Sequence, residues 1–415
     1  MFSKKYLKTA FVTACIIETL CATYFLEITN STSFFSIVYF IAGISIGILI
    51  LFFPQYKKNV SIIERKYDAE FFFKILLIAG VAFFLFYGSK NLFAENPIDY
   101  RNADMLPVIK TMNERFLNGQ WKHVYDNIPG IWDGSKPIYL PFMWLPFSPA
   151  VAFDFDVRWI TVAALFIVFI ILIKAFQFKK NKTFSFLILI SSLAILYWLF
   201  WQDDTHGFIS LTEEGVIVLF YVLLALTLMT ENIFLISVTV CLCMLSRYSA
   251  IGFVPAFLIY LLLNKKNKQA FLFSVIGVIF GLIFFIIPFG WKPFIELIKL
   301  PSSYINFSKI VWKDTPEVFT AGLGFARFFI PEKINVLHYL LIALTFIVPA
   351  AFILFCHSFR KKIQFNNVPL ATMKISLVIF YNFIDVPYLY LFYTSTLVSL
   401  VIAINFLRED FDLSS

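Results

Sequence analysis

Long apolar runs recur from one end of the chain to the other, separated by short polar links. They lie near residues 9–27, 34–53, 71–93, 159–177, 184–201, 213–229, 232–246, 250–263, 271–289, 335–356, 370–384 and 387–406. A helix crosses a membrane with about 20 apolar residues, whereas barrel strands are short and alternate apolar with polar positions. The pattern predicts an all-α polytopic membrane protein of about 12 transmembrane helices, forming a single domain over residues 1–415.

Basic residues gather in alternate links of this pattern, and acidic residues gather in the others. The basic links include residues 57–66, 179–182, 265–268 and 360–362. Because cytoplasmic loops are enriched in Lys and Arg, both termini are expected in the cytoplasm of a multi-pass cell-membrane protein, as in a bacterial inner membrane. The net charge of +8 follows from this asymmetry, so nucleic-acid binding is not expected.

Two long polar segments interrupt the apolar pattern, and both are expected on the extracytoplasmic side. They divide the domain into an N-terminal hairpin (1–70), a first loop (94–158), central helices (159–289), a second loop (290–335) and C-terminal helices (336–415). Within the first loop, residues 137–152 are apolar but contain four prolines. We expect that stretch to be re-entrant or to lie on the surface, because protein can cover its irregular backbone.

The first loop carries the residues best suited to chemistry. Asp104 precedes an amphipathic pattern that ends at Asn118-Gly119, which predicts a surface-lying helix starting near Asp104. A carboxylate there is either an N-cap or a general base. Asp99, five residues earlier, is the competing candidate for the base.

A resemblance to a known family rests on the spacing of several motifs between residues 94 and 270. An acid after a membrane helix is followed by Asn-Gly, a tyrosine, a Tyr-x-Pro segment and a basic residue before a Pro-containing helix. The matching residues are Asp104, Gly119, Tyr125, Tyr139-Leu140-Pro141, Leu145-Pro146, Arg247-Tyr248 and Pro255. The pattern resembles the GT-C integral-membrane glycosyltransferases, and more narrowly family 87, the polyprenyl-phosphate-mannose-dependent mannosyltransferase type.

The chain departs from that family at two places. It has Thr212-Glu213-Glu214-Gly215 where the family often shows Gly-Gln-x-Asn, and Arg247-Tyr248 where the family has Lys-Pro. Arg247 is nevertheless physically suited to a phosphate, because its planar fork can bind two oxygens at once.

The resemblance implies inverting transfer of a hexose, such as mannose, from a polyprenyl-phosphate donor to a lipid-linked or glycan acceptor. It implies Asp104 as the base, with Asp99 as the alternative, and Arg247 at the donor phosphate. Further candidates for substrate binding are Arg101, Glu213 and Tyr139.

No cofactor is expected, and membrane lipid is the surrounding partner. The resemblance implies metal-independent or weakly metal-dependent transfer. His206 with Asp203 and Asp204 could hold a divalent ion, but their spacing matches no established metal signature.

A second interpretation is a multi-pass transporter or flippase of a lipid-linked or anionic substrate. Glu18 supports it, because an acid in the middle of a membrane helix is a functional candidate by default. The charges otherwise gather in one loop, and no two halves with corresponding broken helices are visible, as transporters often show. A third interpretation, a non-catalytic membrane scaffold, would leave the charged residues of the first loop unexplained.

Overall fold

The computed structural model of the 415-residue chain describes residues 4–24, 32–54, 69–100, 104–130, 136–177, 182–202, 207–300 and 304–408, and these ranges are helical with no β-strand. A helix lies over each of the twelve predicted apolar runs. The main helices are α1 (Lys4–Ala22), α3 (Thr32–Ile50), α4 (Ala69–Glu95), α8 (Arg158–Ala175), α9 (Lys182–Trp201), α11 (Glu214–Thr230), α12 (Ile233–Met244), α13 (Phe253–Leu263), α14 (Asn267–Gly281), α15 (Ile287–Phe289), α19 (Ile334–Ser358), α20 (Val368–Phe383) and α21 (Phe392–Arg408).

Seven spans within the described ranges are long and apolar enough to cross a membrane. They correspond to α3, α4, α8, α9, α14 with α15, α19, and α21 with the turn before it. The apolar helices α11, α12 and α13 are shorter. The protein is therefore an all-α polytopic membrane protein, as the sequence predicts, and the crossing of all twelve helices stays a prediction.

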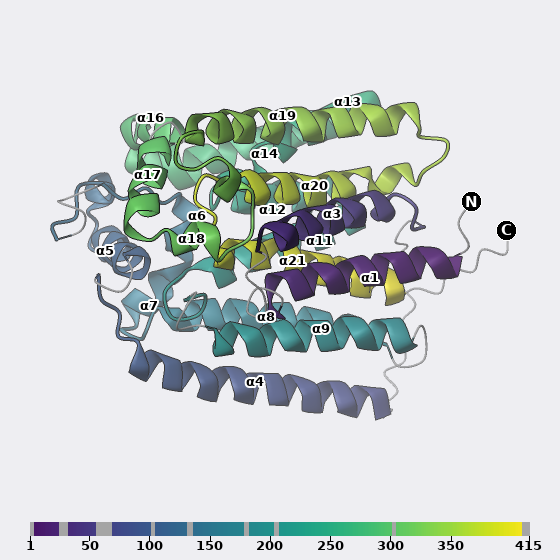
Figure 1. Cartoon of the computed structure of the whole chain (residues 1–415). Coiled ribbons are helices and arrows are strands. Elements are labelled where there is room, and N and C mark those ends of the chain that lie inside the picture. The colour runs from purple at the N-terminus through teal and green to yellow at the C-terminus, as the bar shows by residue number, and fades with distance from the viewer. Residues whose placement is uncertain are drawn as a thin grey trace.

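Helix α21 is the centre of the bundle. It packs against α1, α8, α9, α11 and α20, and the span Leu389–Leu407 is entirely buried. Figure 1 shows it enclosed by the neighbouring helices. Its hydroxyl residues Thr394, Ser395 and Thr396 reach polar groups on the surrounding helices, so the core of this bundle contains buried polar contacts.

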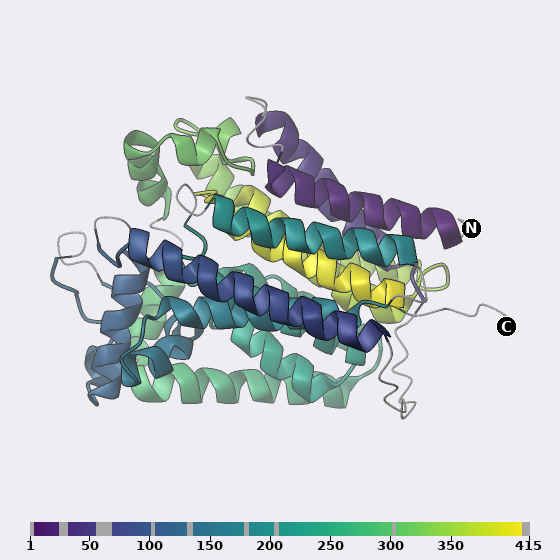
Figure 2. The same cartoon turned by 90° about the horizontal axis from the view of Figure 1, so that it is seen from below.

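The short helices of the two polar segments gather at one end of the bundle. They are α5 (Met105–Leu117), α6 (Pro141–Trp144), α7 (Ser148–Ala152), α16 (Trp291–Lys299), α17 (Tyr304–Asp314) and α18 (Glu317–Thr320). The link between α19 and α20, with the basic residues 360–362, lies at the opposite end (Figure 1). Figure 2 shows α5 running across the end of the bundle rather than along it. Both polar segments thus lie at the same end of the bundle. That this end faces the extracytoplasmic side stays a prediction.

The proline-rich stretch 137–152 does not form one spanning helix. It folds as three short turns, α6, the 3₁₀ turn Leu145–Phe147 and α7, each with a proline at its first or second position. Proline fits there because the first helical N–H groups have no partner within the helix. Asn113 of α5 holds this stretch in place by donating to the Trp144 carbonyl over 2.9 Å and accepting from Ser148 over 2.6 Å.

Candidate functional site

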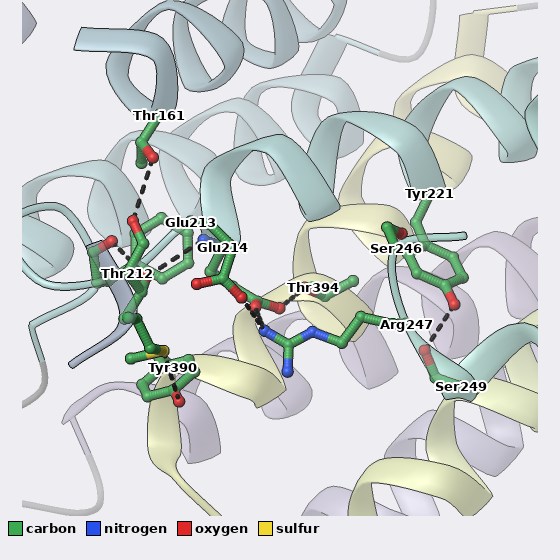
Figure 3. A network of polar contacts seen from close by, with 12 residues as sticks. Thr161, Thr212, Glu213, Glu214, Tyr221, Ser246, Arg247, Ser249, Tyr390 and Thr394 are labelled. Carbon is green, nitrogen blue, oxygen red and sulfur yellow. Dashed lines mark hydrogen bonds and ion pairs between the residues drawn. The ribbon is translucent and has the colours of Figure 1, made fainter. Parts of the chain in front are cut away.

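The most concentrated charge in the described structure is a buried cluster of Arg247, Glu213 and Glu214. Nη2 of Arg247 donates to Oε1 of Glu213 over 2.9 Å and also to Oε2 of Glu214. Both glutamate side chains are fully buried, and 16% of the Arg247 side chain is exposed. Figure 3 shows the two carboxylates converging on one guanidinium nitrogen, while the other terminal nitrogen points away from them. One guanidinium thus serves two buried carboxyl groups.

The start of α11 places the two glutamates. Thr161 of α8 donates to the Thr212 carbonyl over 3.2 Å, and the Thr212 hydroxyl accepts from the Glu214 backbone N–H. A Cβ on Gly215 would lie 2.7 Å from the Thr161 carbonyl oxygen, so only glycine allows α11 to approach α8 this closely. Neither glutamate side chain is needed to cap the helix, and both carboxylates are free to face Arg247.

A break between two short helices places Arg247. Helix α12 ends at Met244, and Arg247 takes an extended backbone before the 3₁₀ turn Tyr248–Ala250. The backbone N–H of Phe142, from the proline-rich stretch, donates to the Leu245 carbonyl over 2.8 Å. The first loop therefore packs directly on the break.

Arg247 and Glu213 both keep unused hydrogen-bonding capacity. Nε of Arg247 and Oε2 of Glu213 are buried and have no partner among the described residues. Glu214, by contrast, accepts a 2.7 Å bond from Thr394 of α21 as well as the one from Arg247. Unsatisfied buried polar atoms are costly and call for an explanation, and a bound ligand would supply one.

Asp104 immediately precedes α5, as predicted, but its side chain does not cap the helix. Asp104 is half-buried. Burial raises the pKa of its carboxyl above the ordinary value, and the negative charge of Glu213 raises it further. The next residue, Met105, accepts a 3.7 Å contact from the Tyr390 hydroxyl, which is part of the network in Figure 3. Asp104 therefore lies within electrostatic reach of the Arg247 cluster.

Tyr139 belongs to the same region. Burial raises the pKa of its phenol well above the ordinary value, and the charges of Asp104 and Glu213 contribute. Its carbonyl accepts a 3.0 Å bond from the Tyr125 hydroxyl, which in turn accepts from Trp144 Nε1 over 3.3 Å. Of the residues chosen from the sequence, Arg247 and Glu213 are thus in contact, and Asp104 and Tyr139 lie within electrostatic reach of Glu213.

The remaining candidate residues are either exposed or outside the described residues. Asp99 lies exposed after the end of α4. Arg101, Asp203, Asp204 and His206 lie outside the described residues. Within the described ranges, no group of three or more His, Cys, Asp or Glu side chains is arranged to hold a metal ion.

Sequence reasoning missed two groups. The first is a pair of His338 in α19 and Asp385 in the link before α21, whose Nδ1 and Oδ2 atoms are 2.6 Å apart. The only available signal was that Asp385 lies in the short link between the apolar runs 370–384 and 387–406.

The second missed group is the partner of Glu18, which is Lys374 of α20 at 2.5 Å. Both side chains are fully buried. Lys374 is itself a charge inside an apolar run, so the reasoning that selected Glu18 applied to it as well.

No protein-family model, curated protein or solved structure matches this chain. The fold and the cluster therefore define the class on their own: a polytopic α-helical membrane protein with a buried, mostly acidic site at one end of its bundle.

Proposed function

We propose that the protein is a membrane glycosyltransferase that moves a hexose, such as mannose, from a polyprenyl-phosphate donor to a lipid-linked or glycan acceptor on the extracytoplasmic side. The observation that carries the proposal is the 2.9 Å hydrogen bond from Arg247 to Glu213, with Asp104 and Tyr139 within electrostatic reach of Glu213. Asp104, Tyr139 and Arg247 come from the motifs that resemble family 87, whereas Glu213 lies where the chain departs from that family. The four positions are far apart in the chain.

In the proposed reaction, the acceptor oxygen attacks the anomeric carbon from the side opposite the phosphate. The bond from the anomeric carbon to the phosphate oxygen breaks, and its electron pair stays on the phosphate. Asp104 takes the proton of the acceptor hydroxyl, and its raised pKa makes it a better base than an ordinary surface aspartate. The configuration at the anomeric carbon is inverted.

Arg247 would meet the donor phosphate through the edge of the guanidinium that the glutamates leave free. Its bonds to Glu213 and Glu214 both leave from Nη2, so the other terminal nitrogen, Nη1, which points away from the carboxylates (Figure 3), would donate to a phosphate oxygen. The unpartnered Oε2 of Glu213 would accept a hydrogen bond from a sugar hydroxyl.

The test is a transfer assay with the purified full-length chain in nanodiscs. The donors are polyprenyl-phosphate mannose and glucose, the acceptors are octyl mannoside and octyl glucoside, and the readout is release of polyprenyl phosphate with formation of a disaccharide. We expect transfer with at least one pair and loss of transfer in Asp104→Asn. Transfer that Asp104→Asn leaves unchanged would remove Asp104 from the mechanism.

A transporter or flippase is the second candidate, and the Glu18–Lys374 pair favours it. Lys374 Nζ donates to Glu18 and to the Ser395 hydroxyl over 2.7 Å, whereas Oε2 of Glu18 is buried and has no partner within the described part of the chain. Buried charges between membrane helices often mark transport pathways. Movement of a fluorescent polyprenyl-phosphate sugar between the leaflets of proteoliposomes, without any transfer, would favour this candidate.

A further inference from the structure

Helix α16 of the second loop has an apolar stripe that the rest of the bundle leaves uncovered. Trp291 is 60% exposed, Ile295 46% and Ile298 59%. A helix turns by about 100° per residue, so these three side chains form one stripe that is about 60° wide. The proposed transfer reaction uses none of them.

Charged residues border this apolar stripe on one side. Lys299 and Lys292 come next around the helix, and Glu296 lies beyond them. Both lysines are exposed. Glu296 is compensated by Lys136 of the first loop, whose Nζ lies 3.0 Å from each carboxylate oxygen. The order of apolar side chains, then cations, then a compensated acid is typical of a helix that lies in a membrane interface.

The other side of the stripe is packed against the bundle, and this packing fixes the rotation of α16. Phe294 packs edge-to-face on Phe285 of the preceding span, with their ring centroids 5.4 Å apart. Leu297 is buried, and its carbonyl accepts a 2.7 Å bond from the Tyr248 hydroxyl. Because these contacts hold one face of the helix inward, the apolar stripe faces away from the bundle.

The stripe follows directly on a surface that lipid surrounds. The span Asn267–Phe289 is long and apolar enough to cross a membrane, and Ile283 and Ile287 near its end are exposed. Only Gly290 separates this span from α16, and its φ of 89° is one that glycine adopts readily. The lipid around the span therefore reaches the start of α16.

We propose that α16 is an interfacial helix of the leaflet at this end of the bundle, with its apolar stripe among the acyl chains and its two lysines at the phosphates of anionic lipids. The inference does not rest on the proposed function, since a sugar transferase and a lipid transporter would both meet this leaflet. It places the lipid surface beside the segment that carries Arg247, because the next residue, Tyr248, is hydrogen-bonded to α16.

The experiment attaches the environment-sensitive dye NBD to single introduced cysteines of the full-length chain in nanodiscs. The five native cysteines are buried, so labelling of them is low. Leu76→Cys, on the exposed face of the span α4, gives the reference for a probe in lipid. We expect the probe at Ile298→Cys to match that blue-shifted emission and to be quenched by a doxyl group on a lipid acyl chain. Ile295→Cys is a second position on the stripe, and a probe at Glu296→Cys should emit as in water.

The two lysines are tested with the probe at Ile298→Cys and two quencher lipids. Doxyl-labelled phosphatidylglycerol is anionic, and doxyl-labelled phosphatidylcholine has no net charge. We expect the anionic lipid to gather around α16, by up to about fivefold for each lysine, and to quench more strongly. Lys292→Gln with Lys299→Gln should remove the difference. Lys309→Gln with Lys313→Gln removes two exposed lysines of α17 at the same end of the bundle, and this matched control should keep it.

Each part of the inference has a result that overturns it. A probe on the stripe that emits as in water overturns the inference. A probe that is shielded from water but not quenched by lipid also does, because it would mark a protein partner or a second copy of the chain on the stripe. Equal quenching by the two lipids, or loss of the difference in the α17 variant, overturns the assignment of the lysines to lipid phosphates. None of these measurements uses transfer, so the proposed function is tested separately by its own assay.

Discussion

Nη2 of Arg247 donates a 2.9 Å hydrogen bond to Oε1 of Glu213, a residue 34 positions earlier in the chain. The same nitrogen also bonds Glu214. Arg247 therefore has two roles, because it compensates two buried acids and still offers Nη1 to a ligand. A substitution at Arg247 therefore changes the stability of the protein as well as its binding.

We predict that Arg247→Ala lowers both stability and donor binding. Removing one partner of a buried ion pair costs about 3–5 kcal/mol, and here two carboxylates lose their cation. Thermal unfolding in detergent should show a clearly lower midpoint, and Glu213→Gln with Glu214→Gln in the same chain should restore most of it. Donor binding should stay weak in that triple variant. Restored binding without the guanidinium would exclude Arg247 from the donor site.

We predict that Asp104→Asn reduces transfer by about 10²–10⁴-fold with little change in stability. The side chain of Asp104 makes no capping bond, and Asn is as good an N-cap as Asp, so a structural role predicts no large loss. Asp99→Asn is the matched comparison, and the exposed position of Asp99 predicts nearly full activity. The reverse result would move the base to Asp99.

We predict that transfer is lost on the acid side at a higher pH than an ordinary aspartate would give. A base works only when ionised, so the rate is present above its pKa and falls as the pH drops through it. Burial and the charge of Glu213 raise the pKa of Asp104, which moves this loss to higher pH. In a pH profile of kcat/KM, Glu213→Gln should move the acid limb to lower pH, since it removes one of the two causes. An acid limb that does not move would contradict the electrostatic influence of Glu213 on Asp104.

We predict that Glu18 and Lys374 act as one unit. Lys374→Met alone leaves a buried carboxylate and should destabilise the protein by about 3–5 kcal/mol. Glu18→Leu combined with Lys374→Met should recover most of that loss, because an apolar pair can replace a buried ion pair. Transfer activity in the double variant is the functional readout. Normal transfer by the double variant would mean that the pair serves helix packing. A double variant that is stable but no longer moves lipid between the leaflets would support the transporter candidate.

We predict that the end of the bundle with the first loop faces outward and that the end with the basic links faces the cytoplasm. Asn127→Cys in the first loop should react with a membrane-impermeant maleimide added outside intact cells, and Lys266→Cys and Lys361→Cys should not. The background is low because the five native cysteines are all buried. Labelling of Lys361→Cys from outside would reverse the orientation that the charge pattern predicts.

The sequence by itself determined the class of the protein and the positions of its helices. Apolar length is a local property, so all twelve predicted runs coincide with helices, and the helix that begins after Asp104 and ends before Gly119 was visible in its periodicity. Proline spacing likewise indicated that 137–152 is irregular. These features depend on neighbours in the chain, which a sequence displays directly.

Only the tertiary structure decided which charges meet. Glu18 pairs with Lys374, which lies 356 positions later in the chain. His338 of α19 pairs with Asp385, which follows α20. The pairing of Arg247 with both glutamates needed the close approach of α11 to α8 at Gly215 and the packing of Phe142 on Leu245. Ion pairs in a membrane protein are set by which helices pack together and at what depth, and neither quantity is encoded in local periodicity. The acids and bases were visible in the sequence, whereas their partners were a property of the fold.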